Sequence, residues 1–199
     1  DAAGSLALNG GAITATGAIT LNEAIALGID TVLTGQSVTL ASTVNGAFGL
    51  TINASGTTTL SGAIGGSTAL TSLTTDAAGT LVLNGGAIRA SNAITLNDAI
   101  ALGIDAVLTA PNVTLASTVD GGYALTINAS GTTTFGGAIG GSTALASLTT
   151  DAAGTLVFNG GSITTTGAVS FGEAVVLGAG TTITTTNAAV SFGSTVNSD

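Results

Sequence analysis

The side chains with catalytic potential in this chain are its carboxylates, because the other usual groups are missing. The 199 residues include ten Asp and Glu, a single basic residue (Arg89), and no His or Cys. Without His, the chain lacks the usual general base and the commonest transition-metal ligand. Without Cys, it has neither a disulfide framework nor a thiolate metal site. Acid–base or metal chemistry would therefore have to come from carboxylates alone.

These carboxylates recur at equivalent positions of a long repeat and do not gather in one cluster. Members of a set lie one repeat apart in the sequence, and about four stacked coils would separate them by about 19 Å. That distance is well beyond the spacing of paired glycosidase carboxylates. Different sets could meet one coil apart, but residues 31–75 contain no acid. We therefore predict no catalytic residue and expect acids that are solvated at turns. The sets are Asp1, Asp76 and Asp151; Glu23, Asp98 and Glu173; and Asp30 with Asp105.

Metal and phosphate sites are not expected either. The Gly- and Asp-rich nonapeptide that binds Ca²⁺ in solenoids is absent, since every Gly-Gly pair is followed by Ala, Ser or Tyr. Calcium takes six to eight oxygens, whereas each predicted turn offers at most one carboxylate, which leaves room only for isolated, weak sites. Gly-rich segments such as 62–66 have neither the Lys nor the following helix of a phosphate loop. We predict no metal ion and no cofactor.

Charge and hydropathy exclude two classes of partner. The formal net charge of −9 argues against nucleic acid and anionic lipid. The mean hydropathy is +0.68, but Thr, Ser, Asn and Gly interrupt every window, and a membrane-spanning helix needs about 20 consecutive, mostly apolar residues. We expect no membrane insertion of this segment. With no initiator Met or signal peptide, we expect a piece of a longer protein.

A long internal repeat organises the chain. The motif Asp-Ala-Ala-Gly opens each copy, and the first two copies align without a gap and differ at 17 positions. The third copy is truncated and more diverged. A repeat that stops partway through a copy is typical of one array and not of separate domains, so we assign residues 1–199 to a single array. The copies are residues 1–75, 76–150 and 151–199.

A shorter period within each copy predicts the fold. Segments such as Ser37–Leu40 alternate apolar and small polar residues, the pattern of a β-strand, and Asn-Gly pairs such as Asn45-Gly46 mark turns. Apolar anchors recur about every 19 residues on average, as in a stack of coils. We therefore predict an all-β parallel β-helix (β-solenoid) with about four coils per 75-residue repeat and a rod of roughly 50 Å. The two anchor series are Leu21, Leu40, Leu60, Leu83 and Leu96; and Leu33, Ile52, Leu73, Ile88 and Leu108.

Two substitutions between copies agree with such a rod. Phe135 takes the place of Leu60, and Phe158 takes the place of Leu83, so we expect both rings in the core. Pro111 replaces Gln36, which a turn tolerates and a central strand does not.

The threonine runs suggest a second kind of surface. They could place rows of hydroxyl groups on a flat β face, the one respect in which the chain resembles β-solenoid ice-binding proteins. Because the runs do not recur in every coil, we expect this array to be broken, and Thr is also an ordinary outward-facing strand residue. The runs are Thr57–Thr59, Thr132–Thr134, Thr164–Thr166 and Thr181–Thr184.

The segment LTINASGTTTFGGAIGGSTALASLTTDAAGTLVFNGGSITTTGAVSF, residues 125–171, resembles the repeats of large secreted bacterial surface proteins of the filamentous-haemagglutinin or autotransporter-adhesin kind. The likeness is one of repeat style and covers essentially the whole chain. It implies a right-handed parallel β-helix, export to the cell surface, and a structural or adhesive role within a long polypeptide.

Together these observations lead us to expect a non-enzymatic structural or adhesive segment of an exported bacterial surface or extracellular-matrix protein. Unpaired strand edges at the end coils invite self-association, so we expect stacking end to end into filaments. Cell-surface glycan or matrix is the other expected partner. The alternative is a binding module that recognises glycan or an ordered surface such as ice through one face of the solenoid.

Overall fold

The computed structural model describes residues 4–198; Asp1 lies outside this range. Over the described residues the chain forms 26 β-strands and no helix. All neighbouring strands pair in parallel, and each pairs with a strand of the next coil, as Ser5 does with Ala24 and Ile64 with Ile88. The prediction of an all-β parallel solenoid is confirmed.

The coil has three faces, here called A, B and C, which the chain visits in that order. Strand β12 (Ala87–Leu96) turns the corner from face A to face B. Single bridges at Ile64 on face A and Ile139 on face C complete the columns. Face A contains β1 (Ser5–Leu8), β4 (Ala24–Leu27), β7 (Val44–Asn45), β14 (Ala106–Ala110), β17 (Ala124–Ala129), β19 (Ser147–Thr150), β22 (Val169–Phe171) and β25 (Val190–Phe192). Face B contains β2 (Ala12–Thr14), β5 (Thr31–Gly35), β8 (Gly49–Ala54), β10 (Leu70–Thr75), β15 (Asn112–Leu115), β18 (Thr132–Phe135), β20 (Thr155–Phe158), β23 (Ala174–Leu177) and β26 (Val196–Ser198). Face C contains β3 (Ala18–Leu21), β6 (Ser37–Leu40), β9 (Thr57–Leu60), β11 (Thr80–Leu83), β13 (Ala99–Leu102), β16 (Val119–Asp120), β21 (Ser162–Thr165) and β24 (Thr182–Thr185).

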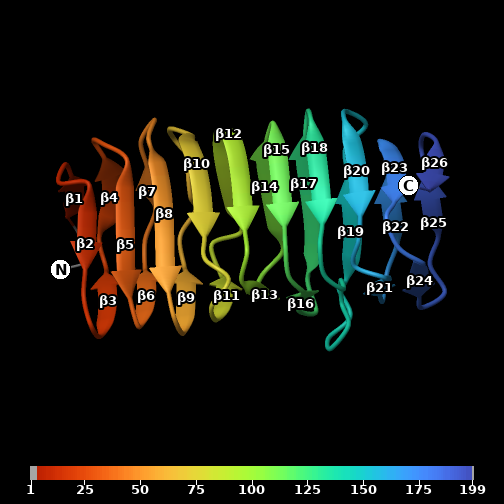
Figure 1. Ribbon diagram of the computed structural model, residues 1–199, viewed down its shortest axis with the longest axis horizontal. Helices are drawn as coiled ribbons and strands as arrows, with labels where there is room; N and C mark the ends of the chain where they lie inside the picture. Colours follow the sequence, from red (N-terminus) through yellow and green to blue (C-terminus); the bar gives the residue numbers. More distant parts are fainter. Residues whose placement is uncertain (1–3, 199) are drawn as a thin grey trace.

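The solenoid is right-handed. In Figure 1 the front strands, including β5 and β8, run downward, while the rear strands run upward and the chain advances from left to right. This hand is the one that right-twisted strands favour for parallel crossovers. It agrees with the handedness that the family resemblance implied.

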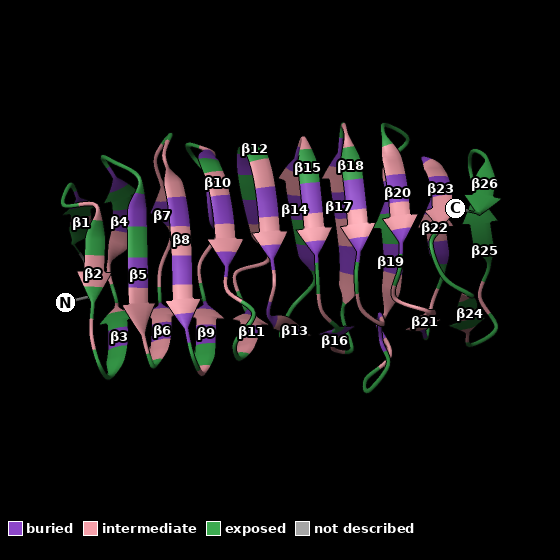
Figure 2. Ribbon diagram, viewed as in Figure 1, coloured by how far each residue is buried: buried purple, intermediate pink, exposed green. Residues whose placement is uncertain are grey.

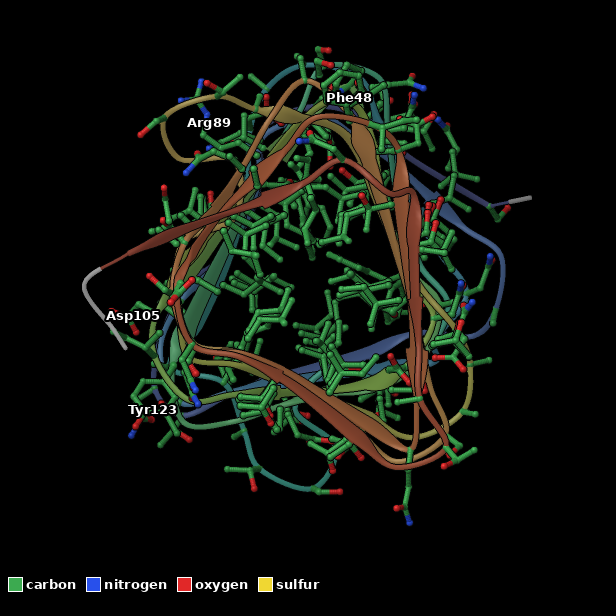
Figure 3. All side chains as sticks on the ribbon, turned by 90° about the vertical axis from the view of Figure 1, so that its left-hand side faces the viewer. Phe48, Arg89, Asp105 and Tyr123 are labelled. Atoms are coloured by element: carbon green, nitrogen blue, oxygen red, sulfur yellow. The ribbon has the colours of Figure 1, made fainter. Side chains whose placement is uncertain are left out.

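Alternating side chains of each strand fill the tube. Along β8 the exposed fraction alternates, with Leu50, Ile52 and Ala54 buried and the residues between them partly exposed. Figure 2 shows this banding in the central strands, and Figure 3, viewed along the axis, shows carbon-rich side chains inside a three-sided outline. Phe135 packs edge to face against Phe158 of the next coil, with ring centroids 6.1 Å apart, and both rings are buried, so their predicted core position is confirmed.

The long repeat is out of phase with the coil. One copy occupies eleven strand positions, which is three and two-thirds turns of a three-faced coil. The first predicted anchor series is therefore confirmed from Leu21 to Leu83 and wrong at Leu96. In the second series the pairs Leu33 with Ile52 and Ile88 with Leu108 are confirmed, and the steps through Leu73 are wrong. Leu83 pairs with Leu102 of face C, whereas Leu96 lies on face B. Likewise, Leu73 pairs with Leu50 and Ile94 and not with Ile52 or Ile88.

The phase shift turns each copy by one face relative to the copy before it. Phe48 and Tyr123 are equivalent residues, yet Figure 3 places them at different corners of the tube. Phe48 lies at the corner between faces A and B, and Tyr123 lies between faces C and A. Equivalent surface groups therefore wind around the rod.

The glycine of the Asp-Ala-Ala-Gly motif allows the coils to approach closely. Gly79 and Gly154 have φ values of 123° and 88°, which L side chains rarely adopt. A Cβ on Gly79 would also clash with the carbonyl oxygen of Gly56 in the coil below. In the second and third copies the motif thus forms a corner that only glycine fits.

Candidate functional site

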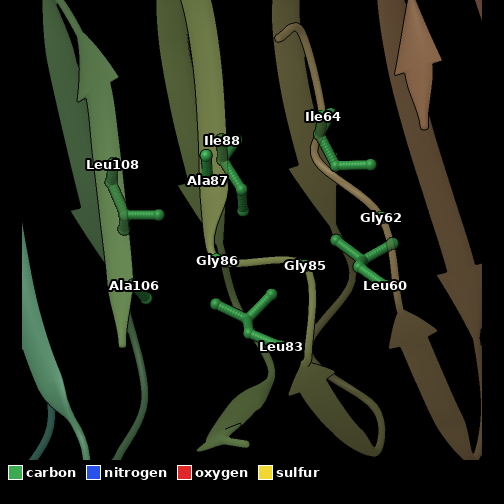
Figure 4. A pocket seen from close by; sticks show the side chains of 10 residues that line it. All are labelled: Leu60, Gly62, Ile64, Leu83, Gly85, Gly86, Ala87, Ile88, Ala106 and Leu108. Atoms are coloured by element: carbon green, nitrogen blue, oxygen red, sulfur yellow. The ribbon is translucent and has the colours of Figure 1, made fainter. Parts of the chain in front are cut away.

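The interior offers no room for a ligand at the void that Figure 4 shows. This void measures about 10 Å³, close to the least space that a water molecule needs, and it has aliphatic walls without polar partners for water. It lies where a single bridge at Ile64 replaces a full strand of face A. Its lining residues are Leu60, Gly62, Ile64, Leu83, Gly85, Gly86, Ala87, Ile88, Ala106 and Leu108.

Two of the carboxylates are buried inside the corners of the tube. Asp98 and Glu173 are each 1 % exposed, and no hydrogen-bond partner reaches their carboxylate oxygens. The expectation that the acids are solvated at turns is therefore wrong for these two residues. The cause is the coil beneath them, which covers a turn that would otherwise face water.

Acids of two different sets also meet in successive coils, contrary to the expectation from the sequence. Asp98 comes one coil after Asp76, and both lie at the corner between faces B and C. Burial raises the pKa of Asp98 to about 6; the Thr75 hydroxyl opposes this shift and the charge of Asp76 adds to it. Asp76 is held by the Ala54 amide, which donates to its Oδ1 at 3.1 Å.

Glu173 repeats the arrangement at the corner between faces A and B. Burial raises its pKa to about 7, with the Thr150 and Thr133 hydroxyls opposing the shift and Asp151 adding to it. Neither Thr133 nor its equivalent Thr58 makes a hydrogen bond through its hydroxyl. The Thr133 hydroxyl nevertheless lies near enough to Glu173 to oppose the rise in its pKa, whereas Thr58 does not affect the pKa of the shorter Asp98.

The remaining acids with assigned contacts secure the backbone. Asp30 accepts a hydrogen bond from the Gly49 amide at 2.7 Å, and its equivalent Asp105 accepts one from the Ala124 amide at 2.9 Å. Asp120 accepts hydrogen bonds from the amides of Ser142 and Thr143. Across residues 4–198, no three His, Cys, Asp or Glu side chains are grouped so that they could hold a metal ion.

The outer surface of face B carries an unbroken column of threonines. In five successive coils the Thr side chains pair in register, so their hydroxyls recur at about 4.8 Å. Among the described contacts, none of these hydroxyls bonds to another protein atom, whereas the Thr71 hydroxyl donates to the Ala47 carbonyl. Beyond these five coils the column continues as Val32 on one side and Val157 on the other, so the Thr array is interrupted along the rod, as predicted, although it is continuous within these coils. The column is Thr51, Thr74, Thr95, Thr114 and Thr134.

The phase of the repeat creates this column. Thr51 and Thr74 come from the first copy, and the other three members come from the second copy. The first-copy equivalents of these three, Thr20, Thr39 and Thr59, lie on face C. The threonines of the second copy join those of the first copy on face B only because the second copy is turned by one face relative to the first.

A shallow groove of about 580 Å³ lies beside the first two members of the column, Thr51 and Thr74, and extends from there toward the N-terminal coils. It follows the corner between faces B and C over four successive coils, which corresponds to about 14 Å along the axis. Asn53 and Asp76 line it and lie two residues beyond Thr51 and Thr74, so groove and column are neighbours. The lining residues are Ala15, Thr16, Thr34, Gly35, Gln36, Asn53, Ser55 and Asp76.

Exposed apolar side chains lie at the corner between faces C and A. Ile104 and Tyr123 are 45 % and 40 % exposed and occupy aligned positions in successive coils. Val107 beside them is 40 % exposed. In the preceding copy the equivalent positions are Ile29 and Phe48, of which Phe48 packs against the core.

One signal in the sequence would have revealed the stacked acids. The spacing between Asp76 and Asp98 recurs between Asp151 and Glu173, and it is close to the length of one coil. The groove has no such signal, because its residues come from four coils and share no motif.

None of the described residues belongs to a helix, so no helix of the length and hydrophobicity that a membrane span requires is found among them. Comparisons with models of protein families, with curated proteins and with solved structures gave no significant match.

Proposed function

We propose that this chain is a non-enzymatic structural or adhesive segment of an exported bacterial surface or extracellular-matrix protein. The observation that carries the proposal is the phase of the repeat, which turns each copy by one face. Groups presented by one copy recur on a different side in the next copy. A rod built in this way can contact neighbours on all its sides, as a matrix or adhesin requires.

The chemistry of the carboxylates supports a role without catalysis. Asp30, Asp76 and Asp105 accept hydrogen bonds from backbone amides, and Asp98 and Glu173 are enclosed in the tube. A general acid or base must reach the proton that it transfers. These carboxylates instead shape the corners of the coil.

The proposal includes stacking of copies end to end. In the last coil Val190, Phe192 and Val196 are about 40 % exposed or more and occupy core columns, with Phe192 lying on Phe171 at 5.4 Å between ring centroids. A further coil, of the same polypeptide or of a second chain, would cover them in the way that each coil covers the one before it. Unpaired parallel strand edges favour such addition.

Electron microscopy of the chain at micromolar concentration tests the proposal. Filaments with a layer spacing of about 4.8 Å are expected, and Phe192→Asp should shorten or abolish them because it places a charge in the joint. Tyr123→Asp changes an aromatic ring of similar exposure at a lateral corner, so it is the matched control and should leave the filaments intact. Discrete rods of the unmodified chain would contradict end-to-end stacking.

The threonine column of face B favours a second candidate function, recognition of glycan or of an ordered surface such as ice. Its five hydroxyls face outward in register. A binding module would use this lateral face and not the ends. Binding to insoluble polysaccharides or inhibition of ice recrystallisation by isolated rods would support it.

A further inference from the structure

We infer that the groove between faces B and C, together with the threonine column beside it, binds a neutral, linear glycan lying parallel to the rod axis. This inference rests on the second candidate function and names its site and its ligand class. The groove is shallow and open, with a volume of about 580 Å³, so it suits a chain lying along the surface and not a small ligand enclosed on all sides.

The lining of the groove suits a ligand with many hydroxyl groups. Among its side chains, hydroxyls and amides provide both donors and acceptors, and Asp76 adds an acceptor while its Oδ1 receives the Ala54 amide. No other side chain of the groove takes part in the hydrogen bonds found among residues 4–198. These polar groups are therefore available to a ligand. The six polar lining residues are Thr16, Thr34, Gln36, Asn53, Ser55 and Asp76.

Charge decides between neutral and anionic glycans. The groove contains one carboxylate and no cation, and the chain carries a net charge of −9 with Arg89 as its single basic residue. Arg89 projects from face A, away from the groove. A sulfated or uronate-rich chain would be repelled, whereas a neutral chain meets no electrostatic barrier.

The shape of the surface decides between a linear chain and a planar lattice. The regular feature is one column of threonines parallel to the axis. The column on one side of it reads Gly49, Ser72, Ala93, Asn112 and Thr132, and these side chains differ in size from coil to coil. A planar lattice such as ice would need a second regular row, whereas a linear polymer needs only one track. The groove and the column together form such a track.

The second copy supplies a matched control. At the equivalent positions, Pro111 stands in place of Gln36 and Ala110 in place of Gly35, while Asn128 corresponds to Asn53. These residues lie at the corner between faces A and B. The double variant Gln36→Ala/Asn53→Ala alters the groove, and Pro111→Ala/Asn128→Ala makes the same type of change outside it.

Calorimetric titration with cellohexaose, xylohexaose, mannohexaose and maltohexaose tests the inference, with a hexamer of galacturonic acid as the anionic comparison. We expect at least one neutral hexamer to bind, the groove variant to weaken its binding at least about tenfold, and the control to stay within about twofold. Unchanged thermal unfolding midpoints would show that both variants fold.

The column has its own test. Thr95→Val/Thr114→Val/Thr134→Val removes three hydroxyls from face B and preserves β-branched side chains, and Thr20→Val/Thr39→Val/Thr59→Val makes the equivalent change on face C. The face B variant should lose at least about tenfold in affinity for the polysaccharide of the best hexamer, and the face C variant should lose little.

Three results would overturn the inference. They are no binding of any neutral hexamer at millimolar concentration, equal losses in the paired variants, and inhibition of ice recrystallisation without glycan binding. None of them bears on the rod proposal, since filament formation is measured separately on the unmodified chain.

Discussion

Thr20 and Thr95 hold the same place in successive copies, yet Thr20 lies on face C and Thr95 lies on face B. The displacement arises because eleven strand positions do not fill a whole number of three-faced coils. The copies nevertheless join without a break, since each face has the same inward column of Leu, Ile and Val. One sequence thereby fits three different orientations in the same rod.

Removal of a whole copy should leave the fold intact. A chain lacking residues 76–150 joins Thr75 to Asp151, the same junction that Thr75 makes with Asp76. Since any face accepts any copy, we expect a folded rod that is shorter by about 18 Å. Small-angle scattering would measure the length. A chain lacking Ile94 alone would turn Leu96 from the core to the outer surface of face B and should be less stable; equal stability of the two deletions would contradict the stacking that we describe.

The rings of Phe135 and Phe158, which pack edge to face, should contribute strongly to the stability of the core around them. Phe135→Ala should destabilise the rod by about 3–5 kcal/mol, because it opens a cavity against Phe158. Phe135→Leu restores the residue found at the equivalent Leu60 and should cost less than about 1.5 kcal/mol. Urea unfolding gives both values. Similar losses of stability for Phe135→Ala and Phe135→Leu would contradict the packing of Phe135 against Phe158.

The buried acids should make the rod more stable in mild acid. The folded-state pKa values of Asp98 and Glu173, about 6 and about 7, lie above the unfolded values. Their contribution is therefore fully present below about pH 4 and is lost as the pH rises through about 7. Each shift corresponds to about 3 kcal/mol at alkaline pH.

Asp98→Asn/Glu173→Gln removes both titrating groups, so it should raise the stability of the rod at pH 8 and flatten its dependence between pH 5 and 8. Thermal unfolding across this range tests the prediction. The matched control is Asp30→Asn/Asp105→Asn, which alters carboxylates at exposed corners and should leave the slope unchanged. If the stability of Asp98→Asn/Glu173→Gln still falls between pH 5 and 8, the pH dependence arises from other groups.

The glycine that opens a copy should not tolerate a side chain. Gly79→Ala places a Cβ against the Gly56 carbonyl at a φ of 123°, which we expect to cost about 1–3 kcal/mol. Gly122→Ala provides the comparison, because nothing lies within 4 Å of the Cβ that it adds. Chemical denaturation should show a loss for the first change and little for the second. A neutral Gly79→Ala would refute the close approach of the coils at this corner.

The sequence by itself determined the strands, the parallel solenoid and the contents of the core. Alternation in segments such as Ser37–Leu40 separates inward from outward residues, and Leu60 and Phe135 were assigned to the core from substitution between copies alone. These features depend on neighbours along the chain and on the repeat, and both are visible in a single sequence.

Only the tertiary structure decided the phase, the buried carboxylates and the groove. Leu96 and Leu102 are equally good anchors in sequence, and corners of variable length determine which of them lies above Leu83. Asp98 is buried because of the coil beneath it, and the groove draws residues from four coils. Each of these features is a relation between segments of successive coils, so it depends on how many residues each corner absorbs and not on any local pattern.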